Sequence, residues 1–96
     1  MPPSISILLP VYNAESTIGA TIESILRQSF EDYELLVIDD GSTDATSQVV
    51  RNYTDVRIRY ILAEHDYIAS LNLGINQAQG KYLARMDADD IMLHDR

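Results

Sequence analysis

Cysteine and tryptophan are absent from the 96 residues of this sequence. Without cysteine, the chain can form neither a disulfide framework nor a thiolate metal site, so oxygen or imidazole groups must hold any metal ion. Oxygen ligands favour magnesium or manganese over structural zinc. The absence of cysteine therefore narrows the candidate metals to hard divalent cations.

Basic residues are scarce and scattered: seven lysines and arginines stand against fifteen acidic residues, which gives a formal net charge of -8. Such a chain repels phosphate backbones, so we expect no nucleic-acid partner. A small anionic ligand can still bind where a divalent cation supplies positive charge. The acidic surplus is therefore a reason to look for a metal site.

Long apolar runs are missing as well. No stretch approaches the ~20 apolar residues that a membrane span needs, and the start at Met1-Pro2-Pro3 lacks the basic flank of a signal peptide. We expect a soluble, cytoplasmic chain whose contact with a membrane, if any, is made through regions outside it. The apolar share of 46% is typical of a globular protein. This length suits one domain, residues 1–96.

The apolar pattern predicts alternating strands and helices. Short apolar runs predict strands at residues 4–12, 35–38, 56–62 (an edge strand) and 81–86. Apolar residues at helical spacing predict amphipathic helices between residues 13 and 29, after residue 42, and from 67 to 79. We expect Asn13 or Ser16 to cap the first helix, and Gly80 to follow the last helix as a left-handed cap.

This order, β-α-β-α-β-α-β, defines an α/β fold class. Right-handed crossovers turn it into a mostly parallel, Rossmann-like sheet with helices on both faces. Ligands of such sheets bind at the carboxyl ends of the strands. Three predicted strands end there in polar residues: Tyr12-Asn13, Asp39-Asp40 and Asp87-Ala88-Asp89-Asp90. We therefore expect a ligand site at this edge.

The acidic run after the last strand is a candidate site for a metal and a phosphate. Asp87 and Asp89 are two residues apart, so in an extended chain their side chains point the same way. Two such carboxylates repel each other unless a cation joins them, and magnesium or manganese keeps positions open for phosphate oxygens. The alternative is that these aspartates form a turn and cap a helix.

Two further positions suggest recognition of a nucleotide base. Asp39 can accept hydrogen bonds from a base or ribose, whereas Asp40 and Asp44 suit turn and cap positions. The alternative is that Asp39 binds no ligand and, with Asp40 and Gly41, merely forms the turn and caps the following helix. Tyr12 can stack on a base, or it can be an ordinary core or rim residue.

Three segments carry a resemblance to a known family. They are Pro10-Val11-Tyr12-Asn13-Ala14-Glu15, Val37-Ile38-Asp39-Asp40-Gly41-Ser42-Thr43-Asp44 and Ala84-Arg85-Met86-Asp87-Ala88-Asp89-Asp90. In this order they closely resemble the family 2 glycosyltransferases, and the resemblance covers essentially the whole chain. It implies the nucleotide-sugar-binding half of a GT-A fold. It also implies transfer of a sugar from a nucleoside-diphosphate donor, with inversion at the anomeric carbon.

The resemblance implies roles for individual residues. The residues expected to bind the nucleotide sugar are Pro10, Val11, Tyr12, Asp39, Asp87 and Ala88. Within this set, residues 10–12 would form the wall of the base pocket, Asp39 would bind the base, and Asp87 would lie on the ribose or diphosphate side. Asp89 would bind a manganese or magnesium ion, which neutralises charge on the departing diphosphate.

The sequence departs from many family members at two places. They have an asparagine and a glycine where Glu64-His65-Asp66-Tyr67 stands, and an arginine where Leu71 precedes Asn72; those groups often approach the donor. The family's general base, which takes the proton of the acceptor hydroxyl, is expected beyond Arg96. We therefore expect an N-terminal fragment that binds donor but does not transfer sugar alone.

A uracil nucleotide is the commoner donor in the family, so the resemblance favours a UDP-sugar, with an unidentified acceptor. The full-length protein is expected in the cytoplasm, at the inner face of the membrane. The alternative from another class is a magnesium-dependent phosphoacceptor domain of the receiver type, which also gathers aspartates at strand ends. Receiver domains have an acidic pair after the first strand, where this sequence has Pro10-Val11-Tyr12.

Overall fold

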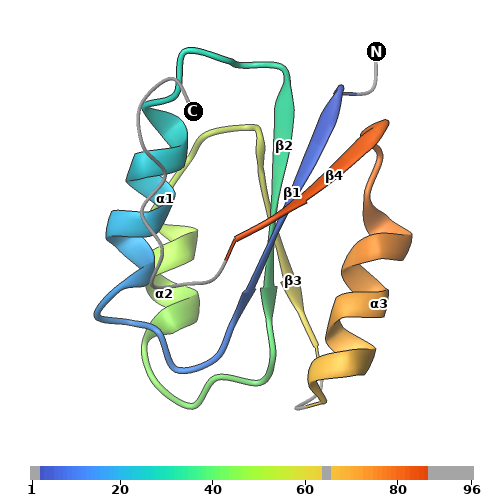
Figure 1. Ribbon diagram of the computed structural model, residues 1–96. Coiled ribbons are helices and arrows are strands. Elements are labelled where there is room, and N and C mark those ends of the chain that lie inside the picture. Colours follow the sequence, from blue (N-terminus) through green and yellow to red (C-terminus); the bar gives the residue numbers. More distant parts are fainter. Residues whose placement is uncertain (1–2, 64–65, 87–96) are drawn as a thin grey trace.

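The structure, a computed structural model, describes residues 3–63 and 66–86 (Figure 1). Its strands are β1 (Ile5–Val11), β2 (Tyr33–Asp39), β3 (Ile58–Leu62) and β4 (Tyr82–Arg85). Its helices are α1 (Ile18–Leu26), α2 (Thr46–Arg51) and α3 (Tyr67–Gln77). Strands and helices alternate along the chain, so the predicted element order is confirmed.

The four strands form one parallel sheet in the order β3-β2-β1-β4. Val11 at the end of β1 pairs with Asp39 at the end of β2, which pairs with Leu62 at the end of β3. At the end of β4, Arg85 pairs with Leu8, and the Met86 amide donates to the Leu8 carbonyl at 3.0 Å. The predicted edge position of β3 is confirmed within the described chain.

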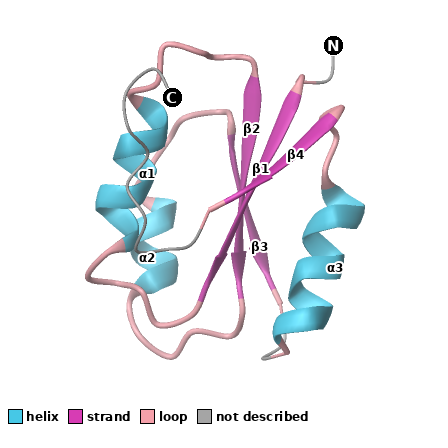
Figure 2. Ribbon diagram, in the orientation of Figure 1, coloured by secondary structure: helices cyan, strands magenta, loops and turns pink. Residues whose placement is uncertain are grey.

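Helices cover both faces of the sheet, α1 and α2 on one face and α3 on the other (Figure 2). Side chains alternate between the faces, as the two-residue repeat of a strand requires. Leu9 and Val11 of β1 pack with Ile22 of α1 in one buried cluster, while Leu8 joins Ile38 in a second cluster on the opposite face. This double coverage is why β1 and β2 are almost continuously apolar.

The start of α1 differs from the expected capping by Asn13 or Ser16. Thr17 occupies the N-cap position, and no side chain caps the helix there. A tight turn precedes it, in which the amides of Thr17 and Ile18 both donate to the Ala14 carbonyl. The capping prediction is wrong because the Asn13 side chain is used elsewhere, by the loop that follows β2.

Gly80 was expected to be a left-handed helix cap, and this is also wrong. The chain leaves α3 at Ala78 in an extended conformation, with φ -67° and ψ 135°. Among the described glycines, only Gly41 has a positive φ, at 78°. Gly80 is instead required for space, because a Cβ there would lie 2.5 Å from the Ser6 amide nitrogen and 2.7 Å from the Ile5 carbonyl carbon.

A buried carboxylate fixes this connection between α3 and β4. Glu34 is only 5% exposed, and it accepts hydrogen bonds from the Ser6 hydroxyl, the Gln79 amide and the Arg59 guanidinium. Burial opposes its charge, but these hydrogen bonds outweigh burial, so the pKa of Glu34 is lowered. The network holds β4 against β1.

Within residues 3–63 and 66–86, no helix is long and apolar enough to cross a membrane.

Candidate functional site

The carboxyl ends of β1, β2 and β3 meet at one edge of the sheet, the lower edge in Figure 1. Two amides extend the ladder past the strands: Asp40 donates to the Val11 carbonyl and Ala63 donates to the Asp39 carbonyl, both at 2.8 Å. The loops that follow the strands therefore begin at the same level. We call this edge, with residues 12–13, 39–44 and 63, the rim.

Asn13 joins two of the rim loops. Its side-chain Oδ1 accepts hydrogen bonds from the Thr43 amide at 2.8 Å and the Thr43 hydroxyl at 3.3 Å, and its own amide donates to the Ser42 hydroxyl at 2.8 Å. Asn13 has a positive φ of 49°, a conformation that asparagine tolerates better than most residues. The neighbouring Tyr12 is thereby held at the rim, with 45% of its surface exposed.

Asp39 ends β2 with a carboxylate that is almost completely buried, at 1% exposure. Its Oδ1 accepts a hydrogen bond from the Ser42 amide at 2.8 Å, and its Oδ2 accepts one from the Tyr60 hydroxyl at 2.6 Å. Burying a carboxylate is costly unless such bonds are made. Burial, together with the hydrogen bond and charge of Asp39, raises the pKa of Tyr60 to about 12, so the hydroxyl remains a donor at neutral pH.

Asp44 lies at the start of α2, as expected of a cap residue, whereas Asp40 was expected to serve the turn or a cap and instead contacts a distant segment. Oδ1 of Asp40 accepts hydrogen bonds from the Asp66 amide at 2.8 Å and the Ser70 hydroxyl, and so anchors the start of α3. Oδ1 of Asp44 accepts from the Thr46 amide at 2.9 Å at the start of α2. The Thr46 side chain is the main cause that lowers the pKa of Asp44, against a smaller opposing effect of burial.

The remaining candidate residues divide between the core and the part of the chain that is not described. Val11 is buried in the cluster beneath α1, and Pro10 precedes it on β1, where it pairs with Ile38. Asp87, Ala88 and Asp89 lie outside the described residues, so their roles stay predictions. Of the family departures, Asp66 is the N-cap of α3, where its side chain accepts from the Ala69 amide, and Leu71 lies within α3.

Tyr60 was missed by sequence reasoning, although it contacts a candidate ligand residue. It lies 21 positions after Asp39, on the neighbouring strand. The alternation of Ile58 and Tyr60 indicates only that both side chains face the same side of the sheet. Their partners depend on strand register, which local spacing does not specify.

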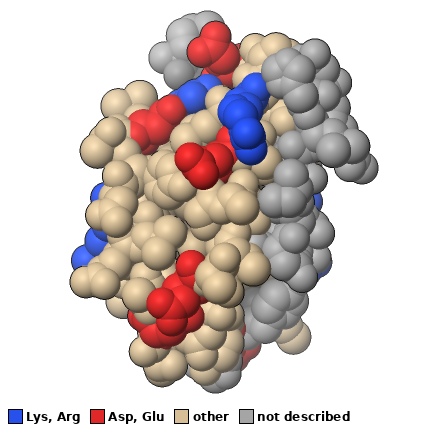
Figure 3. Space-filling model, turned by 90° about the vertical axis from the view of Figure 1, so that its left-hand side faces the viewer, with Lys and Arg blue, Asp and Glu red and all other residues tan. Residues whose placement is uncertain are grey.

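Acidic side chains gather at the rim end of the face formed by α1 and α2, which Figure 3 shows at its lower end. Glu15 and Asp44 meet there, where the Glu15 amide donates to Oδ2 of Asp44 at 3.3 Å. In the described part of the chain, no group of three or more histidine, aspartate or glutamate residues could hold a metal ion. The described rim aspartates accept bonds from protein donors instead, so the expected metal ligand remains Asp89.

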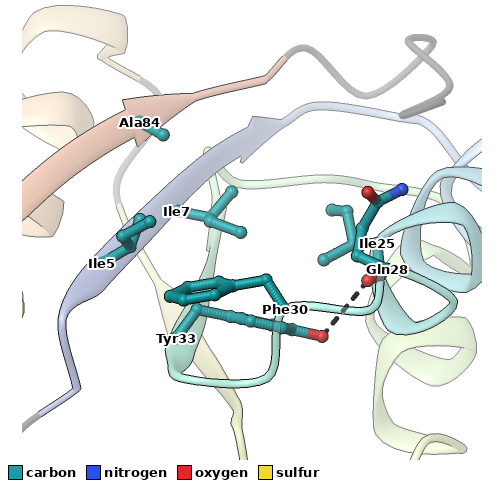
Figure 4. A pocket seen from close by; sticks show the side chains of 7 residues that line it. All are labelled: Ile5, Ile7, Ile25, Gln28, Phe30, Tyr33 and Ala84. Atoms are coloured by element: carbon teal, nitrogen blue, oxygen red, sulfur yellow. Dashed lines mark hydrogen bonds between the residues drawn. The ribbon is translucent and has the colours of Figure 1, made fainter. Parts of the chain in front are cut away.

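A hollow elsewhere on the molecule is apolar and is not part of the rim. It lies beside the amino-terminal half of β1, between β4 and the end of α1, and the Tyr33 hydroxyl donates to the Ile25 carbonyl next to it (Figure 4). Its lining residues are Ile5, Ile7, Ile25, Gln28, Phe30, Tyr33 and Ala84. None of these described lining residues is charged, so the hollow does not suit a diphosphate.

A parallel sheet with helices on both faces and polar loops at the carboxyl ends of its strands is a Rossmann-like nucleotide-binding domain. S. aureus TarS 1-349 in complex with UDP-GlcNAc matches it with a TM-score of 0.85 and 30% identity, over 92% of this chain and 27% of TarS. The mannosyltransferase PcManGT from Pyrobaculum calidifontis, in complex with GDP-Man and Mn²⁺, matches with a TM-score of 0.81 and 26% identity, over 95% and 29%. The fold is that of GT-A glycosyltransferases.

The chain belongs to glycosyl transferase family 2, whose sequence profile matches residues 6–96. An uncharacterized glycosyltransferase of Haemophilus influenzae is 39% identical over 98 residues, which are 98% of this chain and 39% of that protein. The Escherichia coli UDP-Glc:alpha-D-GlcNAc-diphosphoundecaprenol beta-1,3-glucosyltransferase WfgD is 39% identical over 94 residues, 96% of this chain and 37% of WfgD. The chain thus spans less than two fifths of these relatives. The family resemblance is confirmed, and we do not retain the phosphoacceptor alternative.

Proposed function

We propose that these residues form the donor-binding part of an enzyme that transfers a sugar from a nucleoside-diphosphate sugar to an acceptor hydroxyl, with inversion. The observation that carries this proposal is the rim, where Asn13 locks two loops together beside Tyr12 and Asp39. Ligands of parallel α/β sheets bind at this edge. The neighbours solved with UDP-GlcNAc and with GDP-Man support a nucleotide-sugar donor.

The base of the donor would lie against Tyr12, with Pro10 and Val11 forming the adjoining wall. An aromatic face stacks on a heterocycle with about 1 to 3 kcal/mol per base. Asp39 would accept a hydrogen bond from the pairing edge of the base, because each carboxylate oxygen can accept more than one bond. We propose a UDP-sugar as donor, and the UDP and UDP-GlcNAc complexes of TarS support that choice.

Asp87, with Ala88, would lie on the ribose or diphosphate side of the donor, and a manganese or magnesium ion on Asp89 would bind the diphosphate. The rim carries the acidic residue Asp44, which Glu15 adjoins, so a diphosphate there needs a cation to balance its charge. A divalent ion, when bound, supplies Lewis-acid stabilisation of the departing diphosphate. The Mn²⁺ in the Pyrobaculum calidifontis neighbour supports a divalent metal.

The acceptor side of the reaction would be supplied by residues beyond Arg96. Removal of the proton from the acceptor hydroxyl needs a base within about 2.6 to 3.2 Å. We propose that the general base lies in that later part, that residues 1–96 do not transfer sugar alone, and that the full-length enzyme works in the cytoplasm at the inner face of the membrane. WfgD, whose name gives a diphosphoundecaprenol-linked acceptor, supports a membrane location.

Isothermal titration calorimetry with UDP in the presence of Mn²⁺ or Mg²⁺ tests this proposal. We expect metal-dependent binding that Asp89→Ala abolishes. Glu23→Ala is the matched control: it also removes one acidic charge, but from the exposed surface of α1, and it should bind like the wild type. Circular dichroism would first establish that each variant is folded. A folded wild-type chain that binds UDP with neither metal would refute the proposal.

A further inference from the structure

Among the described residues, two protein donors bind the buried Asp39 carboxylate, and they come from different parts of the fold. The Ser42 amide belongs to the loop that directly follows Asp39 and reaches Oδ1 at 2.8 Å. The Tyr60 hydroxyl comes from β3 and reaches Oδ2 across the sheet at 2.6 Å. Tyr60 is therefore the donor that ties the Asp39 side chain to the neighbouring strand.

Tyr60 is itself held in place by three contacts. Its backbone pairs with Val37 in the ladder between β2 and β3. The guanidinium carbon of Arg51, from α2, lies 5.1 Å from the centre of its ring, a cation–π distance. The ring also packs against the buried cluster beneath α1 and α2. A side chain so constrained can dictate the orientation of the group that it contacts.

We propose that Tyr60 is a positioning residue for recognition of the donor base. Its hydroxyl occupies one acceptor site on Oδ2 of Asp39 and so turns the remaining acceptor sites toward the ring N–H of a bound base. The inference rests on the proposed function, since it needs a base at the rim. It predicts a preference for uracil, which has an N–H at position 3, over cytosine, which has an acceptor there.

The test compares the dissociation constants of UDP and CDP by calorimetry in the presence of Mn²⁺, for the wild-type chain, Tyr60→Phe and Tyr53→Phe. Tyr53 is the matched control, because its hydroxyl also makes a hydrogen bond, to the Gly19 carbonyl at 3.2 Å, away from the rim. We expect Tyr60→Phe to weaken UDP binding about tenfold, as for a hydrogen bond to a charged group, and to leave CDP binding unchanged. The UDP-to-CDP preference then falls about tenfold, whereas Tyr53→Phe keeps it.

A double-mutant cycle with Asp39→Asn gives a second measurement that does not depend on the stability of the single variant. If Tyr60 acts through Asp39, Tyr60→Phe has no further effect on UDP affinity in the Asp39→Asn background. A folded Tyr60→Phe variant with the wild-type preference, or with equal losses for UDP and CDP, would overturn the inference and leave the proposed function standing. A wild-type chain that binds neither nucleotide would refute the proposed function, and the inference with it.

Discussion

Replacing Gly80 by alanine tests how β4 is placed beside β1. The added Cβ would lie 2.5 Å from the Ser6 nitrogen and 2.7 Å from the Ile5 carbonyl carbon, whereas real Cβ contacts essentially never fall below 3.0 Å. Both of these atoms are backbone atoms in or next to the central strand, so they cannot move aside as a flexible side chain would. The connection into β4 must therefore move away from β1.

Three hydrogen bonds depend on that connection. The Gly80 amide donates to the Ser6 hydroxyl at 2.8 Å, the Gln79 amide donates to Glu34 at 2.6 Å, and the Tyr82 amide donates to the Ser4 carbonyl at 3.0 Å. At roughly 0.5 to 1.5 kcal/mol each, the loss of all three amounts to about 1.5 to 4.5 kcal/mol of unfolding free energy. Because β4 leads to the acidic run, we also expect Gly80→Ala to weaken metal-dependent UDP binding.

Urea denaturation followed by circular dichroism measures the change. Gly19→Ala is the matched control, because a Cβ at Gly19 makes an ordinary contact of 3.5 Å with the Tyr53 hydroxyl. Gly19 lies inside α1, where alanine is better than glycine by about 0.5 to 1 kcal/mol. The control should therefore be slightly stabilised. A Gly80→Ala variant as stable as the wild type would refute the close approach between the Gly80 connection and β1.

Two further predictions concern the buried network and the rim. Glu34→Gln should lower the unfolding free energy by about 1 to 3 kcal/mol at pH 7. The folded pKa of Glu34 is lowered from 4.5, so the stabilisation that its carboxylate provides is present above pH 4.5 and is lost as the pH falls through the folded pKa. The difference in unfolding free energy between the wild type and Glu34→Gln, measured by urea denaturation, should therefore become smaller over that pH range. A difference that stays constant would contradict this. Asn13→Ala should cost about 2 to 4 kcal/mol, because it loses the bonds to Thr43 and strains a positive φ. Asn13→Gly should lower the unfolding free energy by less, because glycine also loses the bonds to Thr43 but adopts a positive φ without strain. Equal losses for the two variants would show that backbone strain does not contribute to the effect of Asn13→Ala.

The sequence alone predicted the element order and the edge at which the polar loops gather. Apolar runs such as Leu35–Ile38 and the helical spacing from residue 67 onward are local patterns, and a parallel arrangement follows from their alternation. The confirmed sheet places the ends of β1 and β2 side by side, with Val11 paired to Asp39. Family membership was equally readable, because the motifs are short contiguous segments.

The contacts of the site could not be read from local patterns. Asn13 was expected to cap α1, yet it bonds to Thr43, 30 residues later. Gly80 was expected to have a positive φ, yet it is needed because Ser6, 74 residues earlier, lies too close for a Cβ. In both cases the sequence singled out the residue, but the structural role of that residue depends on a contact with a distant segment.

The sequence by itself determined the α/β class, the family and the edge of the sheet at which the polar loops meet, because each depends on neighbouring residues and on strand direction. Only the tertiary structure decided which side chains hold the rim and the connection into β4 in shape. Tyr60 reaches Asp39 from the next strand, and Glu34 binds the connection to β4 from 45 residues away. Such partners are set by strand register and by the packing of elements far apart in the chain, and these arise only when the whole sheet has formed.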